Sequence, residues 1–257
     1  MANLERVRLQ ENMRKIGLSR IPSVLDNYLK DATEHTPSYL EFLDNLFQEE
    51  VGAQEERAFN TKIQRAHFPY IKRIEDFDFS FQASLNKTKI LNLASLSFVE
   101  NKENVIFLGP PGVGKTHLAI GLGLKACMKG YNVLFTTCHD LMSQLVASLA
   151  DNSTDRKIRR LSRYYHLLIL DELGYLPLTK EQTSLFFQIV SKRYERCSLI
   201  LTSNKPFNAW GELLVDSVVA SAILDRLLHH ATVISISGES YRLKDKKKKL
   251  VEKELKV

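Results

Sequence analysis

A glycine-rich segment of this sequence has the residue types and spacing of a phosphate-binding loop. Its eight residues, GPPGVGKT, fit G-x-x-x-x-G-K-[ST] and lie between an apolar run, VIFL, and a helical stretch, HLAIGLGLKAC. Such a loop points its N–H groups at phosphate oxygens, and the following helix adds its positive N-terminal end. Lys115 is expected to reach the β- and γ-phosphates, and the Thr116 hydroxyl to ligate Mg²⁺. The predicted nucleotide contacts here are Gly109, Pro110, Pro111, Gly112, Val113, Gly114, Lys115, Thr116 and His117.

Two adjacent carboxylates follow a second apolar run, Leu167–Leu170. The run delivers Asp171 at its carboxyl end, where open α/β sheets bind ligands. Asp171 is expected to hold Mg²⁺ through water, and Glu172 to orient and polarise the attacking water. A surface turn is the alternative explanation of this pair.

A polar residue ends a later apolar run, in the segment LTSN. From that position Asn204 can sense a γ-phosphate and align the water, although asparagine also commonly serves turns. The residues that follow, Lys205, Pro206 and Phe207, lack the aspartate of the guanine-reading NKxD motif. The sequence therefore favours ATP over GTP.

Two arginines near the C-terminus are candidates for phosphate contacts. Arg226, in AILDRLL, could be an arginine finger that reaches the ATP of a neighbouring subunit, a group that contributes roughly 10³–10⁵ in rate where it has been measured. The alternative is an ion pair with Asp225 or another acid of the same chain. Arg242 could contact the γ-phosphate within its own subunit or belong to the basic tail. The residues expected to act in hydrolysis are Lys115, Asp171, Glu172, Asn204 and Arg226.

A parallel sheet is needed to bring these residues together. From residue 104 short apolar runs alternate with helical stretches, which is typical of buried parallel strands joined by helices. The expected strands are Asn104–Leu108, Asn132–Thr136, Leu167–Leu170, Leu199–Thr202 and Thr232–Ile236, and the expected helices include Thr116–Lys129 and Lys180–Tyr194. Thr179 and Gln182 form a capping-box pattern before the second helix. The fold class predicted is α/β, a P-loop NTPase whose five-stranded parallel sheet carries helices on both faces.

Residues 1–66 predict a small all-helical N-terminal domain for partner binding or assembly. Pro22 lies near the start of one expected helix, while Thr36 and Pro37 give another a hydroxyl N-cap and a first-turn proline. That helix carries an apolar stripe that is either the core of a small bundle or a partner-binding face. The stripe consists of Tyr39, Leu40, Leu43, Leu46, Phe47 and Val51. Residues 67–103 are expected to link this domain to an ATPase domain, 104–243, which a Lys-rich tail follows at 244–257.

Residues 57–73 contain no acid and interleave basic with aromatic side chains. This pattern indicates either a nucleic-acid contact, with Lys62 and Arg65 as its candidates, or a solvated helix end followed by a linker.

Composition sets the class of protein. Of 257 residues, 44% are hydrophobic and 26% charged, which excludes a disordered, collagenous or disulfide-scaffold chain. Residues 242–257 hold 8 of the 36 basic and 3 of the 30 acidic side chains, so the rest of the chain is nearly neutral despite a net charge of +6. Three dispersed cysteines, an N-terminus without an apolar core and the lack of any run of ~18 apolar residues predict a cytoplasmic protein without a membrane span.

Four segments carry a resemblance to a known family: GPPGVGKTHLAIGLGLKAC, LDELGYLPL, LTSN and AILDRLLHHATVISISGESYRL. With them the sequence resembles the IstB-type transposition helper ATPases, relatives of the DnaC-type helicase loaders in the initiator clade of AAA+ proteins. The resemblance covers nearly the whole chain, and LDELGYLPL and the segment around Arg226 are its most specific parts. It implies an AAA+ fold with a role for each matching residue. Lys115 and Thr116 would hold the phosphates and Mg²⁺, and Asp171 and Glu172 the metal and the water. Asn204 would sense the phosphate, and Arg226 would supply the arginine finger.

The same resemblance implies partners. It implies a homo-oligomer that assembles on DNA with ATP and stimulates or targets the transposase of the same bacterial mobile element. Only about twenty residues follow the last expected strand, too few for the usual helical lid of AAA+ proteins. A reduced lid is also what the resemblance to the DnaC-like branch implies. The sensor arginine of the lid then has no clear counterpart in the sequence, and Arg242 is a candidate for it.

The initiator clade inserts extra helix after the second strand, and here 139–150 and 156–165 fill that place. The second of these segments carries five basic residues within eight positions: Arg156, Lys157, Arg159, Arg160 and Arg163. These charges repel one another unless an anion balances them, which favours duplex DNA phosphates over a merely solvated face. Without a base-reading module, binding is expected to be independent of sequence.

Three functions compete. The first is a DNA-dependent ATPase that helps a transposase. The second is a DnaC-like replicative helicase loader, whose main partner is another ATPase. The third is a small-molecule P-loop kinase, in which the basic helix and the tail would have no role.

Overall fold

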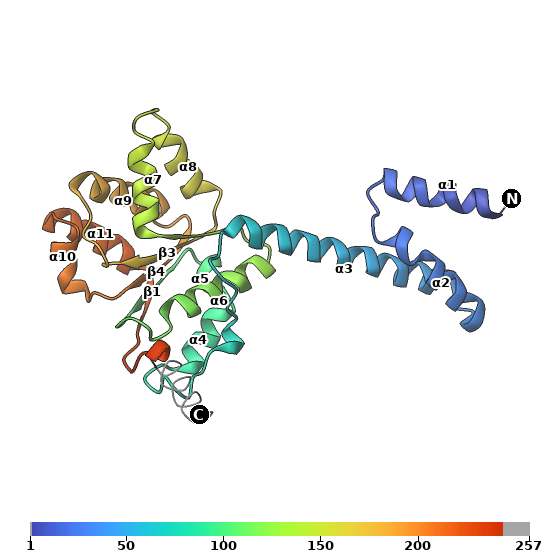
Figure 1. Cartoon of the computed structure of the whole chain (residues 1–257), viewed down its shortest axis with the longest axis horizontal. Coiled ribbons are helices and arrows are strands. Elements are labelled where there is room, and N and C mark those ends of the chain that lie inside the picture. The colour runs from blue at the N-terminus through green and yellow to red at the C-terminus, as the bar shows by residue number, and fades with distance from the viewer. Residues whose placement is uncertain (1, 244–257) are drawn as a thin grey trace, which may run out of the picture. The chain divides into compact units, whose positions relative to one another are not determined.

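The computed structural model describes residues 2–243 (Figure 1). Met1 and residues 244–257 lie outside the described residues, and with them the predicted Lys-rich tail. The chain divides into two compact units between Thr61 and Lys62. The N-terminal unit is built from α1 (Ala2–Lys15), α2 (Ile21–His35) and most of α3 (Tyr39–Ala66). Its small core consists of the buried side chains of Ile21, Leu25 and Leu46.

A buried carboxylate on α3 binds the N-terminus of α2. Oε2 of Glu50 accepts hydrogen bonds from the backbone N–H groups of Arg20 (2.6 Å) and Ile21 (3.0 Å), and Arg57 pairs with Oε1 at 3.0 Å. Burial alone would raise the pKa of Glu50, but hydrogen bonds from the backbone of Ile21, Ser19 and Arg20 and from Arg57 lower this pKa to about 2. The first turn of α2 contains no acid of its own, so α3 supplies the anion that a helix N-terminus favours.

The predicted N-cap at Thr36 is wrong. Thr36 ends α2 in the left-handed conformation, with φ 44°, and its N–H donates to the carbonyl of Ala32. The hydroxyl of Ser38 instead accepts a hydrogen bond from the N–H of Glu41 at 3.2 Å, in the first turn of α3. Thr36 cannot serve both helices, because its backbone is used to terminate the first one.

The apolar stripe of α3 is mostly exposed. Tyr39 is 92% exposed and Leu40 79%, and about half of each of Leu43, Phe47 and Val51 is exposed. Only Leu46 of the stripe is buried. The interpretation of the stripe as a bundle core is therefore wrong for five of its six residues, and the partner-binding face stays a prediction.

The second unit begins with the last residues of α3, and the segment expected to be a linker, 67–103, follows them. It contains η1 (Ile74–Asp76), α4 (Lys87–Ala94) and α5 (Ser97–Glu100). Ile74 is 2% exposed and packs so closely on the next helix that a Cβ on Gly121 would lie 2.7 Å from its Cγ1. The segment is thus packed against the ATPase helices.

A five-stranded parallel sheet forms the centre of the second unit, as predicted. Its strands are β1 (Asn104–Leu108), β2 (Val133–Thr137), β3 (Leu167–Leu173), β4 (Ser198–Ser203) and β5 (Ala231–Ser235). They lie in the order β2-β3-β4-β1-β5. The register between β3 and β4 shifts between Leu170 and Leu173. The two predicted carboxylates, Asp171 and Glu172, lie within this shift.

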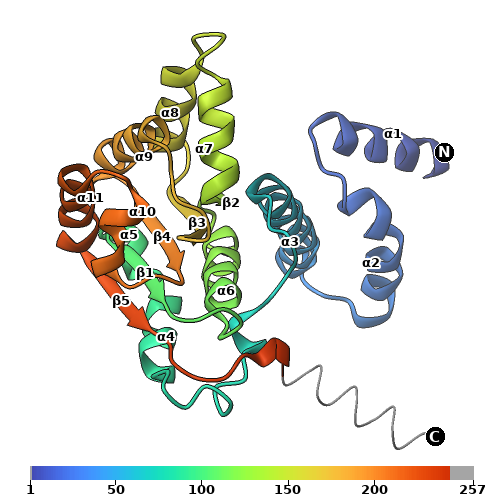
Figure 2. The same cartoon turned by 60° about the vertical axis from the view of Figure 1, so that its left-hand side comes forward.

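Helices cover both faces of this sheet (Figure 2). They are α6 (Lys115–Met128), α7 (Cys138–Ala147), α8 (Thr154–Arg163), α9 (Lys180–Arg193), α10 (Trp210–Leu213) and α11 (Ser217–His229), with the 3-10 turn η2 (Phe207–Ala209) before α10. On one face Leu168 and Leu170 of β3 share a core with α7 to α11. On the other, Ile169 contacts α6 closely enough that a Cβ on Gly123 would lie 2.7 Å from its Cδ1. Side chains that alternate along one strand therefore hold the two layers.

The predicted helix pair after β2 is present as α7 and α8, and the predicted capping box of Thr179 and Gln182 opens α9. After β5 the described chain, up to residue 243, forms no helical domain that could act as a lid. Instead it returns to the phosphate loop, where the N–H of Tyr241 donates to the carbonyl of Gly112 at 3.0 Å. In the described part of the chain, none of the helices is both long and apolar enough to cross a membrane.

Candidate nucleotide-binding site and basic surface

The phosphate loop lies between the end of β1 and the start of α6. Gly112 and Gly114 have φ of 84° and 100°. A Cβ on Gly112 would overlap Oγ of Ser240, and one on Gly114 would overlap the ring of Phe77. Only glycine fits these positions, because both the conformation and the space exclude a side chain. The loop therefore runs close to its neighbours and ends at the N-terminus of α6, where a phosphate is favoured.

Lys115 folds back over the loop. Its Nζ donates to the carbonyls of Gly109 (2.7 Å) and Pro110 (2.8 Å), and the residue is 7% exposed. Burial lowers the pKa of Lys115, and the charge of Asp171 opposes this shift. A phosphate that enters the loop can take over from these carbonyls as the partner of the ammonium group.

Asp171 and Thr116 form the part of the site suited to a magnesium ion. The hydroxyl of Thr116 lies 3.0 Å from both Asp171 carboxylate oxygens, and the Thr202 hydroxyl also donates to Oδ1. Asp171 is only 4% exposed, and burial raises its pKa against these hydrogen bonds and the charge of Lys115. Mg²⁺ prefers such hydroxyl and carboxylate oxygens.

Glu172 sits at the irregular end of β3 in a left-handed conformation, with φ 63°. This conformation costs a non-glycine residue about 1–2 kcal/mol, and such strain clusters at functional sites. Its N–H donates to Oγ1 of Thr202 at 3.0 Å, and its side chain lines the cavity beside the loop. In a regular strand Asp171 and Glu172 would point to opposite faces; the irregularity lets both serve one site.

Asn204 follows β4 on the same cavity. Among the described residues its buried Oδ1 has no hydrogen-bond partner, and a Cβ on Gly174 would lie 2.9 Å from it. A buried acceptor without a donor is costly, so this oxygen suits a donor such as a water molecule. The structure thus places Asn204 on the cavity, and its role as a phosphate sensor stays a prediction.

The cavity beside the loop has a volume of about 340 Å³, the lower end of the range typical of ligand pockets. It is lined by the loop residues Gly112 to His117, by Glu172 and Asn204, and by Arg242. It is also lined by residues that the sequence analysis did not select, among them Tyr70, Phe77, Gln82 and Tyr241. The aromatic residues of the expected linker were the signal that could have found part of this wall. Gly109, Pro110 and Pro111, the first three residues of the loop, are not among the residues that line the cavity.

The His117 side chain turns away from the phosphate loop. Its Nε2 lies 2.7 Å from the carbonyl oxygen of Arg73, and its ring meets that of Phe77 edge-on at 5.2 Å. Burial lowers the pKa of His117, which favours the neutral ring. The imidazole thus holds the segment that precedes α4 against α6. His117 would therefore contribute to nucleotide binding through its position in the first turn of α6 and not through its ring.

The sequence matches the family described as IstB-like ATP binding protein over residues 11–249. The ATP-binding protein of insertion sequence IS21 from Pseudomonas aeruginosa is 45% identical over 240 residues, which cover 93% of this chain and 90% of that protein. Its counterpart in insertion sequence IS5376 of Geobacillus stearothermophilus is 45% identical over 216 residues, 84% of this chain and 86% of that protein.

The chain belongs to the IstB-like ATP-binding protein family.

Solved structures agree with the fold of this IstB-like protein. The crystal structure of DnaI is 24% identical with a TM-score of 0.52, and the match covers 64% of this chain and 90% of that chain. AMPPCP-bound DnaA from Aquifex aeolicus is 23% identical with a TM-score of 0.52, covering 70% and 55%. The predicted α/β fold, a five-stranded parallel sheet with helices on both faces, is therefore confirmed.

Arg226 of the IstB-like protein lies outside its own nucleotide cavity. The guanidinium group donates to the carbonyl of Ala222 at 2.9 Å and lies 5.0 Å from the ring centre of Phe187. Within residues 4–243 no acid forms an ion pair with it, Asp225 included. The structure thus does not bring Arg226 together with Lys115, Glu172 and Asn204.

The five predicted basic residues of α8 form one exposed face, hereafter the α8 basic face: Arg156, Lys157, Arg159, Arg160 and Arg163. The opposite side of the helix, Ile158, Leu161 and Ser162, is buried. In the described part of the chain, no acid pairs with any of the five. Their charges are therefore available to a ligand.

Lys62 lies near the C-terminal end of α3, and Arg65, on the same helix, is exposed. Nζ of Lys62 donates to Oδ1 of Asn132 at 3.0 Å, and Nδ2 of Asn132 donates to the carbonyl of Tyr164, which follows α8, at 3.2 Å. These contacts connect Lys62 to the residue that follows α8, and they do not include Arg65.

Proposed function

We propose that this IstB-like protein is an ATPase that assembles on duplex DNA with its ATP sites at subunit interfaces, and that it stimulates or targets the transposase of its insertion sequence. The observation that carries this proposal is the α8 basic face. Five cations without acid partners lie in the same unit as a site suited to a nucleoside triphosphate. Cations clustered on one face repel one another unless an anion balances them, so the face is suited to a polyanion.

The hydrolysis step uses groups of the chain on both sides of the γ-phosphate. The loop N–H groups and Lys115 bind the phosphate oxygens, while Glu172 accepts a proton from the water as its oxygen attacks phosphorus and the bond to the β-phosphate oxygen breaks. Asn204 Oδ1 orients that water. Thr116 and Asp171 would hold Mg²⁺, which supplies positive charge to the phosphates.

DNA binding follows from local charge. The chain outside residues 242–257 is nearly neutral, so attraction for a polyanion must come from clusters such as the α8 basic face. Contacts to phosphates carry no sequence information, so the binding is independent of sequence.

The position of Arg226 supports assembly. An arginine that lies outside its own cavity and lacks an acid partner is suited to the ATP of an adjacent subunit. Subunits arranged in this way would present several α8 basic faces to one duplex.

The partner follows from the relatives, which are named as ATP-binding proteins of insertion sequences. A helicase loader is the alternative, but its support is limited to a shared fold with DnaI.

The test is ATP hydrolysis with and without duplex DNA. A variant in which Arg156, Arg159, Arg160 and Arg163 are all changed to Ala should keep basal hydrolysis and lose stimulation by DNA. A control that removes the same charge from exposed residues elsewhere carries Lys87→Ala, Lys102→Ala, Lys180→Ala and Arg196→Ala. If the α8 variant and the control are stimulated equally, the proposed role of α8 is wrong; if the unchanged protein does not hydrolyse ATP, the proposed activity itself is wrong.

A further inference from the structure

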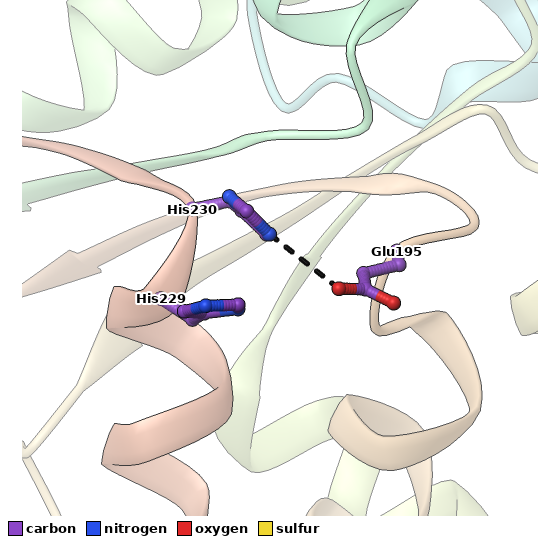
Figure 3. A group of neighbouring side chains, drawn as sticks. All are labelled: Glu195, His229 and His230. Atoms are coloured by element: carbon purple, nitrogen blue, oxygen red, sulfur yellow. Dashed lines mark ion pairs between the residues drawn. The ribbon is translucent and has the colours of Figure 1, made fainter.

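Two histidines and a glutamate lie close together (Figure 3). They precede β4 and β5, at the amino ends of these strands, whereas the nucleotide site lies at the carboxyl ends. Glu195 lies in the turn between α9 and β4, while His229 ends α11 and His230 precedes β5. All three side chains are exposed, and their donor atoms lie within 4.8 Å of one another. Nε2 of His230 is 3.5 Å from Oε1 of Glu195.

These distances are near those of a metal site. Zn²⁺ binds imidazole nitrogen and carboxylate oxygen at about 2.0–2.2 Å in tetrahedral geometry, which places two ligand atoms about 3.3 Å apart. Exposed side chains can close the difference by small rotations.

The backbone under the cluster is fixed by the sheet. Asn104 of β1 donates its N–H to the carbonyl of His230 at 2.7 Å and its Nδ2 to the carbonyl of Leu227 at 3.1 Å. The turn that carries Glu195 is closed by N–H groups of Arg196 and Cys197, which donate to the carbonyl of Arg193 at 2.9 and 3.0 Å. The two segments that supply the ligands are therefore held before any metal arrives.

A neighbouring tyrosine orients one of the rings. The hydroxyl of Tyr194 lies 2.6 Å from Nδ1 of His229, and the two rings are stacked at 5.9 Å. Partners of this kind set the orientation of metal-binding imidazoles and increase metal affinity.

We propose that Glu195, His229 and His230 bind one Zn²⁺ ion, with water completing the coordination. Two imidazoles and one carboxylate select Zn²⁺ over the oxygen-seeking Mg²⁺ of the nucleotide site. The ion links the end of α9 to the end of α11, and Arg226 lies one helical turn before His229. The ion therefore stabilises the end of the helix that carries this arginine.

The experiment is calorimetric titration of Zn²⁺ into the untagged, chelator-treated full chain without nucleotide. One ion should bind per chain, and Glu195→Gln and His229→Ala should each weaken binding at least about tenfold, since each removes one of three protein ligands. His35→Ala is the matched control, because this exposed histidine pairs with Asp31 in the other unit and should leave binding unchanged. Bound Co²⁺ should show the intense visible absorption of tetrahedral coordination.

Two results would overturn the proposal. One is unchanged Zn²⁺ binding in a chain that carries Glu195→Gln, His229→Ala and His230→Ala together. The other is loss of binding in Cys197→Ser, because the ion would then be bound by the nearby thiol. All three ligands are exposed, so circular dichroism should show that these variants keep their fold.

Discussion

Thr202, on β4, donates a hydrogen bond from its hydroxyl to the carboxylate of Asp171, on the neighbouring strand β3. The same hydroxyl oxygen accepts the N–H of Glu172 at 3.0 Å. One side chain thus positions both acids of the site, the one suited to the metal and the one suited to the water. Burial raises the pKa of Asp171, and the hydrogen bond from Thr202 is the first of the contacts that oppose this rise.

The first prediction concerns this threonine. Thr202→Val keeps the shape of the side chain but removes the hydroxyl, so ATP hydrolysis should fall about 10–100-fold, as for other residues that orient metal ligands. The pKa of Asp171 should rise further, because a hydrogen bond to its ionised form is lost. The acidic limb of the rate–pH profile should therefore move to higher pH. Thr202→Ser keeps the hydroxyl and should restore both rate and profile; if Ser and Val behave alike, the hydrogen bonds of Thr202 have no part in hydrolysis.

The second prediction separates binding from chemistry. Lys115→Ala should abolish ATP binding, because the buried ammonium is the cation of the phosphate loop. Glu172→Gln should bind ATP normally but hydrolyse it about 10²–10⁴-fold more slowly, since the amide cannot accept the proton. Equilibrium binding of a fluorescent ATP analogue and steady-state phosphate release measure the two properties. Hydrolysis at the unchanged rate in Glu172→Gln would remove this residue from the mechanism.

The third prediction places Arg226 at the neighbour's ATP. Arg226→Ala should bind ATP but lose hydrolysis and ATP-dependent assembly, by up to about 10³-fold in rate. Mixing it with the Lys115→Ala protein should restore part of the activity, because one interface then joins an intact cavity to an intact arginine. Mixed assemblies must be verified, for example by crosslinking two differently tagged chains. No recovery at any ratio would indicate that Arg226 acts within its own subunit.

Much of the site could be predicted because it is local in sequence. The loop, Asp171 with Glu172, and Asn204 each follow a buried apolar run, and parallel strands bring their carboxyl ends to one edge. What could not be predicted depends on contacts between distant segments. The ring of Phe77 over Gly114 and the position of Gln82 in the cavity wall depend on how residues 67–103 fold back, which no periodicity encodes.

The N-terminal helices show the same limit in another form. Helical spacing predicted where α3 runs, but the same spacing fits a buried and an exposed stripe, and Tyr39 to Val51 proved mostly exposed. Thr36 satisfies the composition of an N-cap, yet its left-handed backbone terminates the preceding helix. Local patterns fix the type of element, whereas tertiary packing decides which face is buried and which of two neighbouring hydroxyls, Thr36 or Ser38, caps a helix.

The fourth prediction concerns pH and the N-terminal unit. The pKa of Glu50 in the folded chain, about 2, lies below its ordinary value of 4.5, so its stabilisation is fully present above pH 4.5 and is lost as the pH falls toward 2. Hydrogen exchange of the full chain, corrected for intrinsic rates, should show α2 losing protection over this range. Glu50→Gln should already be less protected at neutral pH and should depend less on pH. Glu55→Gln, an exposed change on the same helix, is the control, and equal behaviour of the two variants would contradict the role of Glu50.

The last prediction concerns the salt dependence of DNA binding. Each phosphate that a cation neutralises releases counterions, so the logarithm of the binding constant should fall with the logarithm of the salt concentration by about 0.9 per contact. A single subunit offers few contacts, whereas an assembly formed with ATP offers several α8 basic faces to one duplex and gains by multivalency. ATP should therefore raise both the affinity and the slope, as measured by fluorescence anisotropy with two unrelated duplexes of equal length.

The α8 variant should weaken binding to both duplexes alike and reduce the slope by about 0.9 for every arginine that contacts a phosphate. The rival source of this charge is the segment of residues 244–257, which holds much of the net positive charge. Deleting that segment from the otherwise unchanged chain separates the two explanations. Only removal of the cations that contact DNA should reduce the rise in salt dependence that ATP causes. If the deletion abolishes binding while the α8 variant binds with an unchanged slope, the cations of α8 do not contact DNA, and the neutral body of the protein relies on its C-terminus instead.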